Sequence, residues 1–308
     1  MTETVRRATA TEPVIEIGRT VYPVVGPDSS VGAGLQIMLA AALRSLRIAV
    51  QRGEPDRPET IHRFRVGLRR LRSLISAFGS VLPEEERKQL SARLAAYGRR
   101  YSRVREWDVV LSGTLPPMEA ALPDEPALFE LTTCVRAARR HALPGTVNLA
   151  HEAATISQAI ESAAWLHRPQ VGKEAEWNRD LKEFATDLLD KNHRRLKKRL
   201  KHVDLDDQTS FHQLRIRAKK IRYPIELFSN LFVSKETDKY LRQVIAVQDA
   251  LGQLNDALIA RDLITELSLS SRPQGLINGW LAHEIELRRS RFPRAAKKLR
   301  KVEPFWEA

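Results

Sequence analysis

One stretch of the chain occurs twice, 150 residues apart. The segment IHRFRVGLRRLRSLISAF at 61–78 aligns with FHQLRIRAKKIRYPIELF at 211–228 without a gap. The same offset relates weaker matches in the segments before and after it. A single offset over three successive segments indicates a duplicated unit. We therefore expect two homologous helical bundles packed with approximate two-fold symmetry. The identical positions are His62/His212, Arg65/Arg215, Arg72/Arg222, Ile75/Ile225 and Phe78/Phe228.

Apolar residues recur at three- and four-residue spacing along nearly all of the chain, which is the period of an α-helix. Residues 1–30 lack this period and show only a weak strand pattern near Thr20–Val25, so we expect a tail there. The prediction is an all-α fold, with 31–170 as the first half and 174–308 as the second half. The expected helices cover 35–50, 58–78, 84–112, 126–142, 146–167, 176–202, 209–231, 235–269 and 275–301.

The repeated segment places a basic stripe along one face of a helix. Residues at i, i+3, i+7 and i+10 share a helical face, and a basic residue stands at each of these positions in both copies. The apolar positions are displaced by roughly one residue, or about 100° around the helix axis. The stripe therefore lies at the rim of the buried face, where two bundles would meet. Its members are His62, Arg65, Arg69 and Arg72 in the first copy, and His212, Arg215, Lys219 and Arg222 in the second.

Like charges at this spacing repel, so something must neutralise the stripe. One candidate is a set of carboxylates on the following helices, namely Glu106, Asp108, Asp249 and Asp256. The other is a bound anion, and a linear polyanion would match several rows of a stripe about 15 Å long. Basic residues on the preceding helices would add to the same surface or face the solvent, namely Arg44, Arg194 and Lys198.

The net charge and the composition limit which partners, sites and compartments the chain can have. The 308 residues carry a formal net charge of +13, which fits nucleic acid, a membrane surface or a phosphate polymer equally well. The only cysteine, Cys134, excludes an internal disulfide and a multi-thiolate zinc site. No signal peptide is visible, and the longest uncharged apolar stretch, Val31–Leu43, is too short to span a bilayer. We expect a cytoplasmic protein without membrane insertion.

The doubled motif resembles the CHAD domain, the conserved histidine α-helical domain. Two later segments are also similar to elements of that family, VREWDV at 104–109 and LGQLNDA at 251–257, and so is the Phe305-Trp306 ending. The resemblance covers about 31–308. It implies two four-helix bundles related by a pseudo-two-fold axis around a basic central channel. It also implies binding of inorganic polyphosphate, with or without divalent cations, and localisation to polyphosphate granules. The channel-lining candidates it implies are the eight residues of the two stripes.

The chain departs from the family pattern at a few positions. Glu106 stands where the family usually has Asp, and Tyr101-Ser102 replaces the Leu-Gly that occurs at 251–252. Pro224 lies within the second motif helix, where proline removes a backbone hydrogen bond and is expected to kink the helix. The kink would fall at Arg222 and Tyr223.

Other functions remain open at this stage. No nucleotide-binding, zinc-protease or serine-hydrolase motif occurs, so we expect a binding protein rather than an enzyme. A transition metal at His62 and His212 would be repelled by the neighbouring arginines, and no cofactor is expected. Non-specific nucleic-acid binding is the main alternative, although aromatic residues, at 6% of the chain, do not interleave with the stripe. A scaffold for polyphosphate-metabolising enzymes is a third reading.

Overall fold

The computed structural model describes residues 14–17, 20–26, 28–51 and 53–307. Besides helices and the loops between them, the described chain contains one antiparallel strand pair, β1 (Val14–Ile17) and β2 (Thr20–Pro23), in which Val14 pairs with Pro23 and Ile17 with Thr20. The weak strand pattern near Thr20–Val25 thus corresponds to β2. The rest of the expected tail lies partly outside the described residues.

Within the described residues, seven helices belong to the first half of the chain and five to the second. The first set is α1 (Val31–Gln51), α2 (Pro58–Ala77), α3 (Glu84–Arg100), α4 (Ser102–Val109), α5 (Leu115–Ala121), α6 (Pro126–Ala142) and α7 (Leu149–Glu161). The second set is α8 (Glu174–Asn178), α9 (Leu181–Lys201), α10 (Gln208–Phe228), α11 (Ser234–Ile264) and α12 (Ser271–Arg300). A π-helical turn at Val110–Thr114 joins α4 to α5, and short 3₁₀ turns cover Ala164–Leu166, Ser229–Leu231 and Phe305–Glu307.

The expected helix over 84–112 is interrupted. Tyr101 leaves the helical conformation between α3 and α4, and its fully buried hydroxyl donates a 2.7 Å hydrogen bond to Glu152 on α7. Helical structure then continues past residue 112 to Ala121 through the π-helical turn. Helical periodicity alone did not reveal this break, because it depends on a partner about fifty residues away.

Equivalent helices begin at equivalent positions in the two copies. The starts of α1, α2 and α3 at Val31, Pro58 and Glu84 correspond, at the 150-residue offset, to those of α9, α10 and α11. The sequence explains these starts locally: Pro58 occupies the first turn of α2, whereas the Asp207 carboxylate caps α10 by accepting from the N–H groups of Thr209 and Ser210.

The first helices of the two copies are joined by a reciprocal pair of backbone hydrogen bonds. The N–H of Val31 donates to the carbonyl of Arg179, and the N–H of Leu181 donates to the carbonyl of Ser29, both at 2.9 Å. Val31 and Leu181 are equivalent at the 150-residue offset, as are Ser29 and Arg179, so each copy donates one of the two bonds and accepts the other. Phe78 and Phe228, another equivalent pair, lie in ring contact with centroids 5.8 Å apart.

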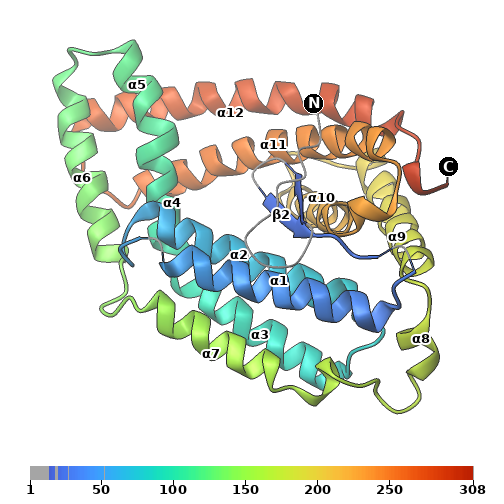
Figure 1. The fold of residues 1–308 in the computed structure, drawn as a ribbon. Helices are drawn as coiled ribbons and strands as arrows, with labels where there is room; N and C mark the ends of the chain where they lie inside the picture. The colour runs from blue at the N-terminus through green and yellow to red at the C-terminus, as the bar shows by residue number, and fades with distance from the viewer. Residues whose placement is uncertain (1–13, 18–19, 27, 52, 308) are drawn as a thin grey trace.

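Three hydrophobic cores organise the molecule. The first joins α1, α2, α3 and α7 with the start of α9, and the second joins α9, α10, α11 and α12. The third draws on both halves, because it joins α4, α5 and α6 to the end of α11 and the start of α12. Figure 1 shows α11 and α12 along one side, α3 and α7 along the other, and α2 and α10 between them. The apolar stripes of α2 and α10 are buried as predicted, so their basic stripes border these cores.

One described helix, α1, is long and apolar enough to cross a membrane by length and composition. The uncharged stretch Val31–Leu43 had suggested that no segment reaches this length. In the fold, α1 buries Leu35, Leu39, Leu43 and Leu46 in the first core, and a buried core helix passes the same test. Its packing on α2 is close, since a Cβ at Gly67 would lie 2.6 Å from Leu46.

Candidate functional site

Three cavities lie along the crossing of α2 and α10. The repeat-interface cavity, of about 490 Å³, is walled by α2, α3, α4, α10 and α11. The α11 cavity, of about 360 Å³, lies between α2, α10 and α11. The α9 cavity, of about 520 Å³, lies between α2, α3, α9 and α10. Arg69 and Lys219 line all three, so the cavities adjoin one another at this equivalent pair.

The repeat-interface cavity is walled by equivalent residues from both copies. Five pairs related by the 150-residue offset line it, which places the junction of the two copies at this cavity. The pairs are Arg65/Arg215, Arg69/Lys219, Arg105/Asn255, Glu106/Asp256 and Val109/Ile259. The stripes and the LGQLNDA segment, which lie far apart in the sequence, therefore meet at one place.

The charge of the walls differs from one cavity to the next. The α9 cavity has seven basic residues and no Asp or Glu among the described residues that line it, namely Arg69, Arg72, Arg87, Lys191, Arg195, Lys219 and Lys220. The repeat-interface cavity adds Glu106 and Asp256 to its arginines and lysine. The α11 cavity has the most carboxylates, with Glu226, Asp249 and Asp256. Net positive charge is thus concentrated on the α9 side.

Arg65 and Arg222 have fixed partners in the protein. The Arg65 guanidinium donates to the carbonyl of Gly98 and, at 3.0 Å, to the Ser102 hydroxyl, which ties α2 to the junction of α3 and α4. Arg222 donates to Glu226 at 2.6 Å and to Gln248 at 2.9 Å. A protein carboxylate therefore does pair with Arg222, and that carboxylate, Glu226, was not among the acids named from the sequence.

The other acids expected to offset the stripe divide into two groups. Asp108 is buried and pairs at 2.6 Å with Arg139 on α6, so it has a structural partner away from the stripe. Asp256 and Glu106 face the cavity, where burial raises the pKa of each carboxyl above its usual value. The hydrogen bond from Asn255, and then the charge of Arg215, partly offset this for Asp256, and Arg103 and Arg65 do so for Glu106.

His62 and Lys219 respond to the surrounding charge. Desolvation by the surrounding protein, followed by the charges of Arg105, Arg69, Arg65 and Arg63, lowers the pKa of His62 to about 4, although the residue remains exposed to solvent. Its imidazole is therefore neutral near pH 7, and the donor form expected from the sequence requires an anion nearby to raise the pKa again. Burial, and then the arginines around it, lowers the pKa of Lys219 to about 8.

The sequence-predicted site residues separate into two sets. Seven line the cavities: His62, Arg65, Arg69, Arg72, Arg215, Lys219 and Arg222. Four line none of them: His212, Arg44, Arg194 and Lys198, all of which are exposed. Arg194 forms an ion pair with Asp190 on its own helix. The role of each residue in binding stays a prediction.

Several cavity residues were not singled out from the sequence. They are Arg87 and Arg99 on α3, Arg105 on α4, Lys191 and Arg195 on α9, and Lys220 on α10. The repeat alignment contained a signal for Arg105, because it pairs this residue with Asn255 in the LGQLNDA segment. The sequence did not show which face of α9 packs toward α10, because basic residues cover all sides of the helix in HRRLKKRLKH.

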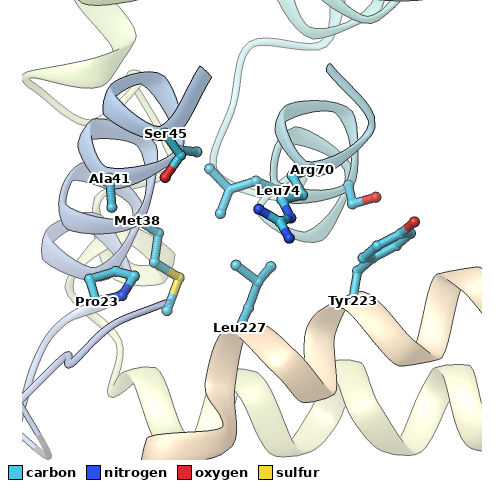
Figure 2. A pocket seen from close by; sticks show the side chains of 10 residues that line it. Pro23, Met38, Ala41, Ser45, Arg70, Leu74, Tyr223 and Leu227 are labelled. Atoms are coloured by element: carbon cyan, nitrogen blue, oxygen red, sulfur yellow. The ribbon is translucent and has the colours of Figure 1, made fainter. Parts of the chain in front are cut away.

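A fourth cavity is apolar and is not part of this site. Figure 2 shows Met38 of α1, Leu74 of α2 and Leu227 of α10 around it, with Arg70 and Tyr223 at its edge. Its volume of about 40 Å³ leaves room for a few water molecules, whereas ligand pockets hold several hundred Å³. We interpret it as a packing gap where α1, α2 and α10 meet.

Comparison with known proteins decides the family. The family model of the CHAD domain matches residues 37–265, which is most of the chain. The chain belongs to the CHAD family. The CHAD resemblance seen in the doubled motif is thereby confirmed, and so is the all-helical architecture.

Two solved structures resemble this chain in fold. The crystal structure of the CHAD domain from the plant Ricinus communis is 26% identical, with a TM-score of 0.72 over 91% of this chain and 95% of that one. PptA from Streptomyces chartreusis is 16% identical, with a TM-score of 0.59 over 87% of this chain and 100% of that one. At that identity the second likeness concerns the fold alone. No curated protein matches the chain.

Proposed function

We propose that this CHAD protein binds inorganic polyphosphate in a basic channel formed where its two repeat copies meet. The observation that carries the proposal is that Arg69 and Lys219 line three adjoining cavities together, surrounded by the other members of both stripes. A polymer with one charge on every phosphate can contact successive arginines along such a path. Planar guanidinium groups bind phosphate oxygens in pairs, which favours this class of anion.

The channel follows from a two-fold arrangement of two bundles. The reciprocal hydrogen bonds of Val31 and Leu181, the Phe78–Phe228 ring contact and the five equivalent pairs around the repeat-interface cavity all support a pseudo-two-fold axis between the copies. The third core contains residues of both halves, so the two bundles share a core and are not fully separate. It would hold the copies in place around the channel.

Because the three cavities differ in charge, the two ends of the proposed channel would bind polyphosphate with different strength. The α9 cavity would hold the polymer most tightly, because its seven basic residues face no carboxylate among the described lining residues. The α11 cavity would bind it least tightly, since Glu226, Asp249 and Asp256 offset its charge there. Divalent cations that accompany phosphate would be best tolerated at that end.

The proposed role is binding and organisation of the polymer, not catalysis. We propose that the protein acts in the cytoplasm, on polyphosphate granules, alone or with polyphosphate-metabolising enzymes as partners. Non-specific nucleic-acid binding is the alternative outcome of the test below.

The decisive experiment is a competition at constant salt. Labelled long-chain polyphosphate is bound to the full chain, and unlabelled polyphosphate or single-stranded DNA of equal total charge is added. We expect polyphosphate to compete at least about tenfold better, and its affinity to fall steeply with salt as counterions are displaced. Equal competition by DNA would show that the channel recognises charge density alone and would overturn the polyphosphate assignment.

A further inference from the structure

Lys219 differs chemically from every other member of the two basic stripes. The stripes contain five arginines, two histidines and this one lysine, and its equivalent in the first copy is Arg69. Arginine is charged at all physiological pH values and is a poor nucleophile, whereas lysine has a primary amine that can form an amide. Among the chain's 14 lysines, Lys219 alone lies at the junction of all three cavities.

The surroundings of Lys219 favour the neutral amine. The side chain is partly buried, and in the described chain it makes no hydrogen bond or ion pair. The groups facing it are Arg215 on its own helix, Arg69 and Arg65 on α2, and Asp256 on α11. Burial and the three arginines act against its ammonium form, and Asp256 offsets only part of this effect.

The resulting pKa makes the amine reactive near neutral pH. At a pKa of about 8, about a quarter of the Lys219 amine is neutral at pH 7.5, against about 0.1% for a lysine with the usual value of 10.5. The same arginines that disfavour the ammonium form also attract phosphate groups. A reagent that has both a phosphate and an electrophilic carbon would therefore be concentrated next to a nucleophile.

We propose that Lys219 is a site of non-enzymatic acylation by small acyl phosphates. The phosphate of the reagent is bound by Arg65, Arg69 and Arg215, and the acyl group lies toward the lysine. The lone pair of Nζ attacks the acyl carbon, a C–N bond forms, and the C–O bond to phosphate breaks. The amine proton is transferred to the leaving phosphate, so the products are the amide and hydrogen phosphate. No other reactant is needed.

The modification removes a positive charge at the crossing of the stripes. This consequence rests on the proposed function, because the acylated amide can no longer attract polyphosphate and adds bulk where the three cavities adjoin. Bound polyphosphate would in turn protect Lys219, since it occupies the same arginines and raises the lysine pKa. The acylation itself depends only on the cavity and its charges.

The test measures acylation of each lysine in the full chain. The protein is incubated with acetyl phosphate at pH 7.5, cleaved at acidic residues and examined by peptide mass spectrometry, with fragmentation distinguishing Lys219 from Lys220. We expect Lys219 to react about tenfold faster than Lys198, because its larger neutral fraction outweighs the weaker nucleophilicity of a less basic amine. Lys198 is the internal control, as it is exposed and lines no cavity.

One variant and one competing ligand serve as further controls. Lys219→Arg keeps the charge and reproduces the first copy, and it should remove this modification without changing the rates at other lysines. Excess pyrophosphate should slow acylation at Lys219 only. Equal rates at Lys219 and Lys198, or no effect of pyrophosphate, would overturn the proposal. Rapid acylation in a protein that fails to retain polyphosphate would instead overturn the proposed function and leave the modification site standing.

Discussion

Arg69 and Lys219 occupy the same position in the two repeat copies and line the same three cavities. The charge of Arg69 contributes to lowering the pKa of Lys219, after burial and Arg215. The two positive charges therefore repel each other in the free protein. An anion bound between them would relieve that repulsion, so this pair is the natural centre of the proposed binding site.

Reversing the charge of the central pair should abolish polyphosphate binding. We expect Arg69→Glu/Lys219→Glu to weaken binding by about 100-fold or more near physiological salt, because two attractive contacts become repulsive. Isothermal titration calorimetry with long-chain polyphosphate measures the change. Far-UV circular dichroism checks that helical content is retained.

The matched control for this variant is Arg136→Glu/Arg291→Glu. Both residues are exposed, lie within α6 and α12, and line none of the three cavities. The control changes the net charge by the same amount. A similar loss of affinity in both variants would mean that overall charge, and not the cavity walls, determines binding.

The two faces of α9 should contribute differently. Lys191 and Arg195 line the α9 cavity, whereas Arg194 and Lys198 lie outside all three. We expect Lys191→Ala/Arg195→Ala to weaken binding about tenfold and to reduce the slope of log affinity against log salt by about 2. For Arg194→Ala/Lys198→Ala we expect less than about a twofold change. The reverse order would move the binding surface to the face of α9 that carries Arg194 and Lys198.

Removing the carboxylate of Asp256 should strengthen binding. Asp256 lines two of the cavities and opposes Arg215, so Asp256→Asn should raise polyphosphate affinity by about fivefold at pH 7.5. Because burial raises the Asp256 pKa, the wild-type carboxylate becomes protonated earlier than usual as the pH falls. The advantage of the variant should therefore shrink as the pH is lowered. An advantage that is independent of pH would show that Asp256 acts through packing and not through charge.

Acid should destabilise the protein through His193, which belongs to the second core. This buried imidazole is hydrogen-bonded to Tyr240 and packs edge-on against Trp306. Burial, together with Lys197, lowers the pKa of His193 to about 4. The unfolded chain therefore binds more protons than the folded protein between about pH 6.5 and 4, and stability is lost as the pH falls through this window.

Urea denaturation at pH 7 and pH 5 measures this effect. We expect the free energy of unfolding to fall by about 2 kcal/mol from His193 alone. His193→Gln should be less stable at pH 7, since it loses the ring packing, but its stability should depend less on pH. An unchanged pH dependence in His193→Gln would assign the acid sensitivity to other groups, such as His62.

Local sequence predicted the helices and the stripes well. The helix starts follow from proline, Asp caps and apolar period, all of which act within a few residues. The burial of Ile61, Phe64 and Leu68 on α2 follows the period directly. The stripe members that line the cavities were predictable for the same reason, because a helix turns equivalent positions to one side.

The structure differs from the sequence-based predictions where segments far apart in the chain meet. The expected helix over 84–112 breaks at Tyr101, whose hydroxyl bonds to Glu152 on α7. Arg222 pairs with Glu226 one turn further along α10, and only the fold adds Gln248 of α11 as a second acceptor for its guanidinium. Pro224 lies within an uninterrupted α10, which runs on to Phe228. His212 has the same place in its copy as His62, yet only His62 lines a cavity.

The sequence by itself determined the family, the helical class, the duplication and the positions of the basic residues, because each of these depends on local period or on a repeat visible in one dimension. Only the tertiary structure decided which of those charges share a cavity, which are cancelled by a carboxylate and which face the solvent. Charge interactions depend on distance and burial, and the packing of α2, α9, α10 and α11 sets both through contacts between residues far apart in the chain.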